Sequence, residues 1–342
     1  MSYPSYRQPV RPPSRNSGCG CWILVFVLII AGIYSTVRYF VDQDNYTKAH
    51  SAYIQNDCDT ALNHYDSVVN SWRIFDFGSY ADRSQQERAE CQAYTAAIAK
   101  QSSSDPSGAV LAYSDFIHNH GTSLLASDVH SRIQSLVTQT PSETLATEAF
   151  CDQFDYLQQN NFIPTGNNVL PDLMYQCGQM YFANNNFLKV VNIDEEFLSR
   201  YPNDPRASDV ESALARSIVA SSKSSSAGTI PAPNLSGITA GGSAVVIARN
   251  DSPNRLRIAL SGPDGRVEEL PACASCTTYS SFGPLSCPDL GPVGRYTVTP
   301  GQYDVVVQSI SDTSVTPWTG TWNLGSGDEY SSCFFMVTTT VP

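Results

Sequence analysis

A single uncharged stretch near the N-terminus constrains this chain more than any other feature. Residues 22–37 read WILVFVLIIAGIYSTV, and their flanks extend the apolar run to about 20 residues, the length that a helix needs to cross a bilayer. Trp22, Tyr34 and Tyr39 lie toward its ends, where aromatic rings favour the membrane interface. We therefore predict one transmembrane helix over residues 21–41.

The charges around this segment predict its orientation. Three arginines precede it: Arg7, Arg11 and Arg15. Asp42 and Asp44 follow it, so the positive-inside bias places residues 1–20, an expected disordered tail, in the cytoplasm and the ectodomain outside. A cleaved signal peptide is the rival interpretation, but no suitable small-x-small cleavage site follows the apolar run. Cys19 and Cys21, on the cytoplasmic side, are either acylation sites or plain reduced thiols.

The ectodomain is acidic, which excludes one class of partner. Residues 42–342 hold 16 basic and 32 acidic side chains. Nucleic-acid binding needs clustered Lys and Arg against phosphate. We therefore expect no DNA or RNA partner for a single-pass protein of the cell membrane.

The first part of the ectodomain is predicted to be a duplicated helical module. Apolar residues within 42–222 recur three and four positions apart, as they do along one face of a helix. The tetrapeptide ASDV occurs at 126–129 and again at 207–210, and Phe116 and Phe197 keep the same offset. Cysteines recur in the same order upstream of the two copies: Cys58 and Cys91, then Cys151 and Cys177.

These four cysteines are expected to form one disulfide in each module, Cys58–Cys91 and Cys151–Cys177, because thiols oxidise outside the cytoplasm. Each bond would close a loop of about 25–35 residues and contribute roughly 3–4 kcal/mol by chain entropy. A metal site is the weaker alternative, since the spacings are not C-x2-C and no histidine accompanies them.

The second copy carries a recognisable pattern. Residues 175–187 read YQCGQMYFANNNF, and residues 200–207 read RYPNDPRA. This pattern resembles the tetratricopeptide repeats of bacterial envelope proteins, and residues 53–65 fit it less completely. The resemblance covers roughly half of the chain. It implies a solenoid of helical hairpins that binds partner proteins and carries no catalytic residue.

The composition changes at residues 223–234, where serines and two prolines predict a flexible linker. Residues 235–342 then contain short apolar runs with turn signals about every ten residues, as in a β-sandwich. The segment 300–307, PGQYDVVV, resembles a strand entry of immunoglobulin-like β-domains. We thus expect a multidomain α and β protein: a transmembrane helix, a helical solenoid and a disulfide-bonded β-sandwich.

Four cysteines of the β-domain, Cys273, Cys276, Cys287 and Cys333, allow three pairings, and the sequence does not choose among them. We prefer Cys273–Cys276 with Cys287–Cys333, which ties a proline-rich loop to the last strand. A redox-active C-x-x-C motif and a four-cysteine zinc site stay open as alternatives.

Aromatic residues give the only hint of a binding surface. Trp318 and Trp322 share one face of a predicted strand by their even spacing, and Tyr330 follows nearby. A peptide- or carbohydrate-binding patch is one interpretation of the three, and core packing is the other. The acidic run Asp194-Glu195-Glu196 is expected on an exposed helix face.

The sequence contains no GxSxG, HExxH or phosphate-cradling glycine motif. We therefore assign no catalytic, cofactor-binding or metal-binding residue and expect a non-catalytic scaffold or adaptor of the cell envelope. Its partner proteins would bind the helical repeats. Two alternatives stay open: a polysaccharide- or wall-binding module acting through the β-domain, and an enzyme whose residues form no familiar motif.

Overall fold

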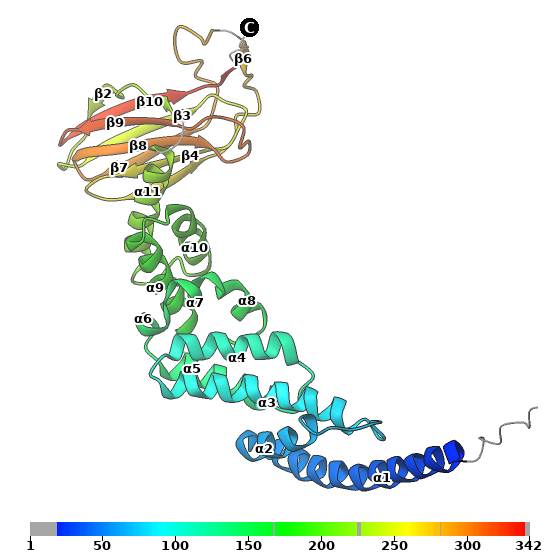
Figure 1. Ribbon diagram of the computed structural model, residues 1–342. Helices are drawn as coiled ribbons and strands as arrows, with labels where there is room; N and C mark the ends of the chain where they lie inside the picture. The colour runs from blue at the N-terminus through cyan, green and yellow to red at the C-terminus, as the bar shows by residue number, and fades with distance from the viewer. Residues whose placement is uncertain (1–18, 167, 224–226, 281, 339–342) are drawn as a thin grey trace, which may run out of the picture. The chain divides into compact units, whose positions relative to one another are not determined.

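The computed structural model describes residues 19–166, 168–223, 227–280 and 282–338 (Figure 1). It combines helices with mixed β-sheets, and its contacts divide the chain into two compact units that meet between Leu136 and Val137. Most of the expected cytoplasmic tail lies outside the described residues.

The N-terminal helix is longer than the predicted membrane span. Helix α1 runs unbroken from Cys19 to Tyr53 over 35 residues, about 50 Å at 1.5 Å per residue. Its first half is apolar and exposed, and it is long and apolar enough to cross a membrane. The helix continues past residue 41, where the membrane span is predicted to end, because no glycine or proline interrupts residues 33–53.

The second half of α1 instead belongs to the first helical unit. Asp42, Ala49 and Tyr53 are buried along one face, against the next two helices. The following helices are α2 (Cys58–Val69), α3 (Tyr80–Ser102), α4 (Pro106–His120) and α5 (Ala126–Gln139), which crosses the boundary between the units. The Asp57 side chain accepts a hydrogen bond from the Thr60 amide and so caps the start of α2.

The second unit begins with shorter helices. They are α6 (Ser142–Leu145), α7 (Glu148–Asp152), α8 (Phe154–Gln159), α9 (Val169–Ala183), α10 (Phe187–Arg200) and α11 (Ala207–Lys223). One prediction fails here. Asp194 of α10 is buried, not exposed, because it faces Gly178 of α9, where an added Cβ would lie 2.6 Å from its carboxylate.

The duplicated tetrapeptide has the same local structure in both copies. ASDV begins α5 in the first and α11 in the second. In the connection before α5 and at its start, the amides of Ser123, Ala126 and Val129 donate to the carbonyls of His120, Ser123 and Leu125. The residues 81 positions later repeat this, because the amides of Asp204, Ala207 and Val210 donate to Tyr201, Asp204 and Arg206.

The rest of the second unit contains two main sheets. The five-stranded sheet has the order β1-β9-β8-β4-β5, and the four-stranded sheet has the order β2-β10-β3-β7. Both are mixed, because β1 runs parallel to β9 and β10 runs parallel to β3. The first sheet consists of β1 (Gly228–Thr229), β9 (Trp318–Leu324), β8 (Gly301–Ser309), β4 (Leu256–Ser261) and β5 (Arg266–Leu270). The second consists of β2 (Asn234–Ile238), β10 (Asp328–Phe334), β3 (Ala244–Asn250) and β7 (Val293–Val298). A small third sheet pairs β6 (Tyr279–Ser280) with β11 (Val337–Thr338).

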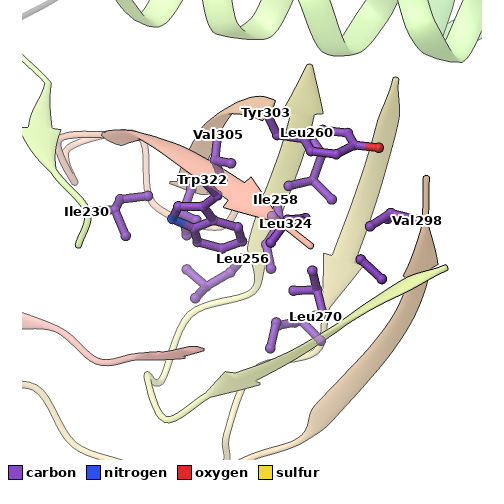
Figure 2. Close-up of a cluster of buried hydrophobic side chains, with 14 residues drawn as sticks. Ile230, Leu256, Ile258, Leu260, Leu270, Val298, Tyr303, Val305, Trp322 and Leu324 are labelled. Carbon is purple, nitrogen blue, oxygen red and sulfur yellow. The ribbon is translucent and has the colours of Figure 1, made fainter. Parts of the chain in front are cut away.

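The two main sheets share one hydrophobic core. Trp322, Ile258 and Tyr303 of the five-stranded sheet pack in one cluster with Val246 and Val298 of the other (Figure 2). In β8 the alternation Tyr303, Val305, Val307 places these side chains on the same inner face. The two sheets therefore bury their inner faces together.

Helix α11 covers the outer face of the five-stranded sheet. Leu214, Ile218 and Val219 form a second buried cluster with Ala259 of β4 and Val306 of β8. One face of β4 and β8 packs in the shared core and the other packs against α11, so residues on both faces of these strands are buried.

The expected flexible linker is largely part of the fold. Gly228 and Thr229 form β1, and Ile230 lies in the shared core. Residues 224–226 of the expected linker lie outside the described residues. A serine-rich composition does not reveal that residues 228–229 pair with the distant strand β9.

Candidate functional site

An apolar cavity opens beside Trp318 at one end of the core between the two main sheets. Its volume is about 240 Å³, smaller than the roughly 300–1,000 Å³ of sites for drug-sized ligands. Its apolar lining includes Leu256, Val307, Val315, Trp318, Phe334 and Met336. A cavity of this size and polarity suits one large apolar side chain or a similarly small apolar group.

The three aromatic residues of the possible binding surface differ in how far they are buried. Trp318 begins β9 and is 49% exposed at the cavity. Trp322 shares its strand face but is fully buried, and its indole N–H donates to the Pro231 carbonyl at 3.1 Å. Tyr330 packs against the core, and its hydroxyl accepts from the Gly325 amide at 2.8 Å. The structure thus leaves Trp318 as the solvent-facing ring of the three.

Gly228 lies against the Trp318 ring, and the sequence analysis did not predict this contact. A Cβ at Gly228 would approach the indole ring to 3.1 Å, closer than nine in ten real Cβ contacts. A side chain at this position, where β1 pairs with β9 at Trp318, would require the ring to shift by a few tenths of an ångström. No local pattern could have revealed the contact, because the two residues are far apart in sequence.

Hydrogen bonds to a buried carboxylate hold residues 289–291 in place near the cavity. The Asp251 carboxylate accepts hydrogen bonds from the amides of Asp289, Leu290 and Gly291 at 3.1, 3.0 and 2.7 Å. Gly291 has no space for a side chain, because a Cβ would lie 1.8 Å from the Asn250 carbonyl oxygen. These contacts hold the loop even though it contains little regular structure.

Two disulfides lie in this part of the chain, in the pairing preferred from the sequence. Cys287 bonds to Cys333 of β10, and Cys273 bonds to Cys276 in a turn. Neither member of the C-x-x-C pair lies in a helix, whereas redox-active thiols gain from a helix N-terminus. Asp251, Cys287 and Cys333 lie close enough to share a metal ion, but the two sulfurs are bonded to each other and offer no thiolate.

We call residues 282–291 the pinned loop, because Asp251 holds its end, and this loop exposes apolar side chains. Phe282, Leu285 and Leu290 are all largely exposed. Gly283 packs so tightly against Phe335 that a Cβ would lie 2.4 Å from its ring, and Phe335 also lines the cavity. The exposed loop and the cavity are therefore neighbours, and together we call them the apolar end of the β-domain.

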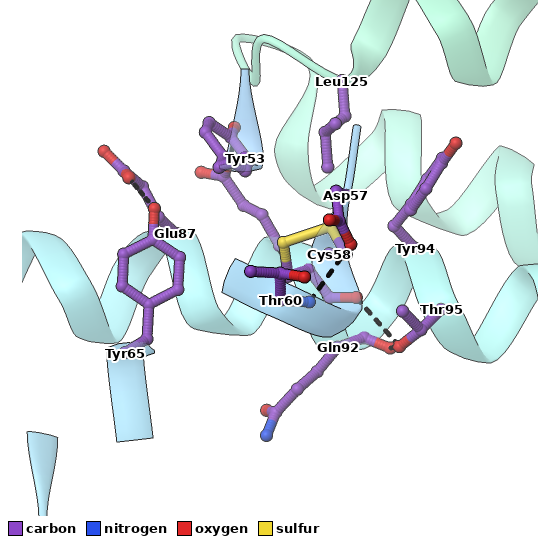
Figure 3. Close-up of a disulfide and its surroundings, with 12 residues drawn as sticks. Tyr53, Asp57, Cys58, Thr60, Tyr65, Glu87, Gln92, Tyr94, Thr95 and Leu125 are labelled. Carbon is purple, nitrogen blue, oxygen red and sulfur yellow. Dashed lines mark hydrogen bonds between the residues drawn. A yellow bond between two sulfur atoms is a disulfide. The ribbon is translucent and has the colours of Figure 1, made fainter. Parts of the chain in front are cut away.

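A second cluster of titratable groups lies in the first helical unit, and Figure 3 shows two of its members, Glu87 and Tyr65. The Glu87 carboxylate of α3 accepts hydrogen bonds from the hydroxyls of Tyr46 and Tyr65, and lies 2.9 Å from His50 Nδ1. Burial and the hydrogen bond to Glu87 raise the pKa of Tyr46 to about 12. Because three partners occupy this carboxylate, the cluster ties α1 and α2 to α3 and leaves Glu87 poorly placed as a general base.

The helical cysteines are also disulfide-bonded. Cys58 of α2 bonds to Cys91 of α3 (Figure 3), and Cys151 of α7 bonds to Cys177 of α9. Both pairs coincide with those expected from the duplicated pattern. They join neighbouring helices covalently, and disulfides of this kind suggest that this region lies in an oxidising compartment.

Comparison with known proteins adds no assignment. No protein-family model matches the chain, and no curated protein is significantly similar to it.

Proposed function

We propose that this protein is a single-pass, non-catalytic scaffold or adaptor of the cell envelope, with its N-terminus in the cytoplasm and its ectodomain outside. The observation that carries the proposal is the unbroken helix α1, whose exposed apolar half continues directly into a half packed within a folded unit. An anchor built in this way holds the adjoining domain at a defined height above the membrane.

Contacts along the outer half of α1 support this rigid coupling. Arg38 Nη2 donates to the Ser67 carbonyl of α2 at 3.2 Å, and the Tyr53 hydroxyl donates to Glu90 of α3. Burial raises the pKa of Tyr53 and keeps it protonated, so it remains a donor. Charged and polar groups thus fasten α1 to its neighbours on the side that does not face lipid.

We interpret the helices as tetratricopeptide-like hairpins and the two-sheet part as an immunoglobulin-like sandwich. The repeated hydrogen-bond pattern at ASDV supports the first interpretation. The core shared by two sheets supports the second. Both architectures commonly serve as binding scaffolds.

We place the partner-binding surface on the apolar end of the β-domain rather than on the helices. Outside residues 72–77, the exposed large apolar residues of the described ectodomain helices and their turns are scattered: Ile54, Leu124 and Leu188. The apolar end instead combines Trp318, a cavity and the pinned loop. Its chemistry suits an apolar side chain of a partner protein. A polysaccharide site would need several exposed rings, and Trp322 is buried.

Protease protection tests the anchor and its orientation. In sealed vesicles with the outer face exposed, protease should remove the ectodomain and leave a small membrane-bound fragment containing Trp22. In vesicles of the opposite orientation the ectodomain should survive until detergent is added. Protection in the first preparation would contradict the proposed topology.

Photocrosslinking in native membranes tests the partner surface. A benzoylphenylalanine replacing Trp318 or Phe282 should give adducts that disappear on protease treatment but not on glycosidase treatment. The matched control replaces Leu188 of α10, whose exposure of 71% lies between that of Trp318 and that of Phe282. Adducts only at Leu188 would return the partner site to the helices, and adducts removed by glycosidase would favour the polysaccharide alternative.

A further inference from the structure

The connection between α2 and α3 carries an unusual set of exposed side chains. Residues 72–77 read WRIFDF, and we call them the aromatic loop. Trp72, Phe75 and Phe77 are 70%, 63% and 54% exposed, and Ile74 is also exposed. A water-exposed loop rarely presents a contiguous group of this kind, since burying each such side chain is worth about 1.5–3 kcal/mol.

The two charged side chains of the aromatic loop, Arg73 and Asp76, are turned toward the protein. The Arg73 side chain is only 13% exposed, and Asp76 is 24% exposed. Arg73 donates to the Val68 carbonyl and to Ser71 Oγ, and its guanidinium lies 3.9 Å from Asp42 and 3.7 Å from Asp76. The loop therefore has the polarity of a lipid-facing surface, with charges turned into the protein and aromatic rings turned out.

The charged groups beside the aromatic loop also sum to no net charge. Arg38 pairs with Asp42 at 2.5 Å, and Arg73 lies near both Asp42 and Asp76. Two arginines and two aspartates sum to zero, so the cluster beneath the loop carries no net charge toward the bilayer. An unpaired charge at that depth would cost several kcal/mol.

The aromatic loop lies against the membrane-spanning part of α1. The Tyr34 hydroxyl donates to the Trp72 carbonyl at 2.7 Å, and their rings are 5.3 Å apart. Phe75 and Phe77 line a groove with residues of α1 that range from Leu28 to Phe40. Tyr34 precedes Arg38 by four residues, about 6 Å along a helix, so the loop extends at least one helical turn below the first charge after the apolar run.

We propose that the aromatic loop is a second membrane contact, inserted among lipid acyl chains in the outer leaflet beside α1. The groove between the loop and α1 is then filled by lipid. Continuity with the exposed apolar span identifies the occupant, because Trp22 to Val37 and the loop would share one bilayer. The hydrogen bond from Tyr34 satisfies the Trp72 carbonyl, as a backbone group at this depth requires.

Two membrane contacts at different positions restrain the orientation of the ectodomain more than a single spanning helix can. One spanning helix permits the ectodomain to rotate and tilt about its axis, whereas an aromatic wedge on one side of α1 restrains both motions. Tryptophan and tyrosine rings favour this interfacial depth. The proposal rests on the membrane anchor of the proposed function, and its test must separate the two.

Quenching of tryptophan fluorescence by brominated lipid tests the aromatic loop and the membrane anchor separately. The full-length protein is placed in phosphatidylcholine nanodiscs with bromine either near the headgroup end or near the middle of the acyl chains. W22F leaves Trp72 as the reporter of the aromatic loop, and W72F leaves Trp22 as the reporter of the anchor. Trp318 and Trp322 of the β-domain provide the same background in both.

We expect W22F to be quenched in brominated lipid, more strongly by bromine near the headgroup end, and the double variant W22F/W72F to lose this quenching. If W72F is quenched and W22F is not, the aromatic loop lies in water and the proposal fails while the anchor stands. If neither is quenched, the anchor itself fails. Blue-shifted Trp72 emission without quenching would mean that a second copy, not lipid, covers the loop, and would also overturn the proposal.

Discussion

At the scale of single residues, Asp194 is the clearest conflict between sequence and environment. It lies in an acidic run but is buried between α9 and α10, and its Oδ2 has no hydrogen-bond partner among the residues that the structure describes. Burial raises the pKa of this carboxyl to about 8. Gly178 makes the arrangement possible, since any side chain there would collide with the carboxylate.

Asp194 should make stability depend on pH. Between about pH 4 and pH 8 the folded chain keeps a proton that the unfolded chain releases, so the free energy of unfolding falls as pH rises, by up to about 1.4 kcal/mol per pH unit. The contribution is fully present below pH 4 and is lost as pH rises through 8. Asp194→Asn should remove this slope and raise the melting temperature relative to wild type more at pH 8 than at pH 5.

Thermal unfolding at several pH values measures the effect. Asp115→Asn, at an exposed position of α4, is the matched control and should leave the slope unchanged. An equal slope in wild type and Asp194→Asn would show that the carboxyl is not protonated in the fold.

At the scale of elements, the disulfides differ in the length of chain that they close. Cys58–Cys91 spans 33 residues and joins two helices, whereas Cys273–Cys276 spans 3 residues within one turn. Both cysteines of the first pair are buried. The helical bond therefore restricts the unfolded chain far more than the bond in the turn does.

Removing each bond should reveal this difference. By chain entropy the double variant C58S/C91S should lose about 4 kcal/mol of stability, and C273S/C276S less than about 2 kcal/mol. Chemical unfolding followed by circular dichroism at 222 nm measures both, and the second variant serves as control for the first. Equal losses would mean that native packing around the sulfurs, not loop closure, sets the stabilisation.

At the scale of the second unit, α11 connects the helices to the sheets. Leu214, Ile218 and Val219 cover Ala259 and Val306 on the outer face of the five-stranded sheet. Lys223 adds an ion pair with Asp304 of β8 at 2.7 Å. The helix is thus a structural part of the β-domain as well as the last member of the helical series.

Ile218→Ala should therefore weaken the sheet as well as the helix. We expect a loss of about 2–5 kcal/mol, typical of a large-to-small change in a core, and faster hydrogen exchange in β4 and β8. Arg216→Ala, at an exposed position of the same helix, should leave both strands protected. Faster exchange confined to α11 would show that the helix is only peripheral to the β-domain.

The sequence by itself determined the order and type of the parts of this protein. An uninterrupted apolar run requires a long exposed helix, periods of three to four and of two separate the helical from the β region, and paired cysteines in an ordered repeat indicate disulfides. Even spacing also placed Trp318 and Trp322 on one strand face. These are local properties, and residues close in sequence decide them.

Only the tertiary structure decided which of those faces is covered. Trp322 is buried and Trp318 is half exposed because the sheet core closes over one and ends at the other. Asp194 is buried by Gly178 of another helix, and residues 228–229 pair with a strand about 90 residues away. The aromatic loop is notable only because it lies against α1. Burial and strand pairing join residues that are distant in sequence, so no local pattern contains them.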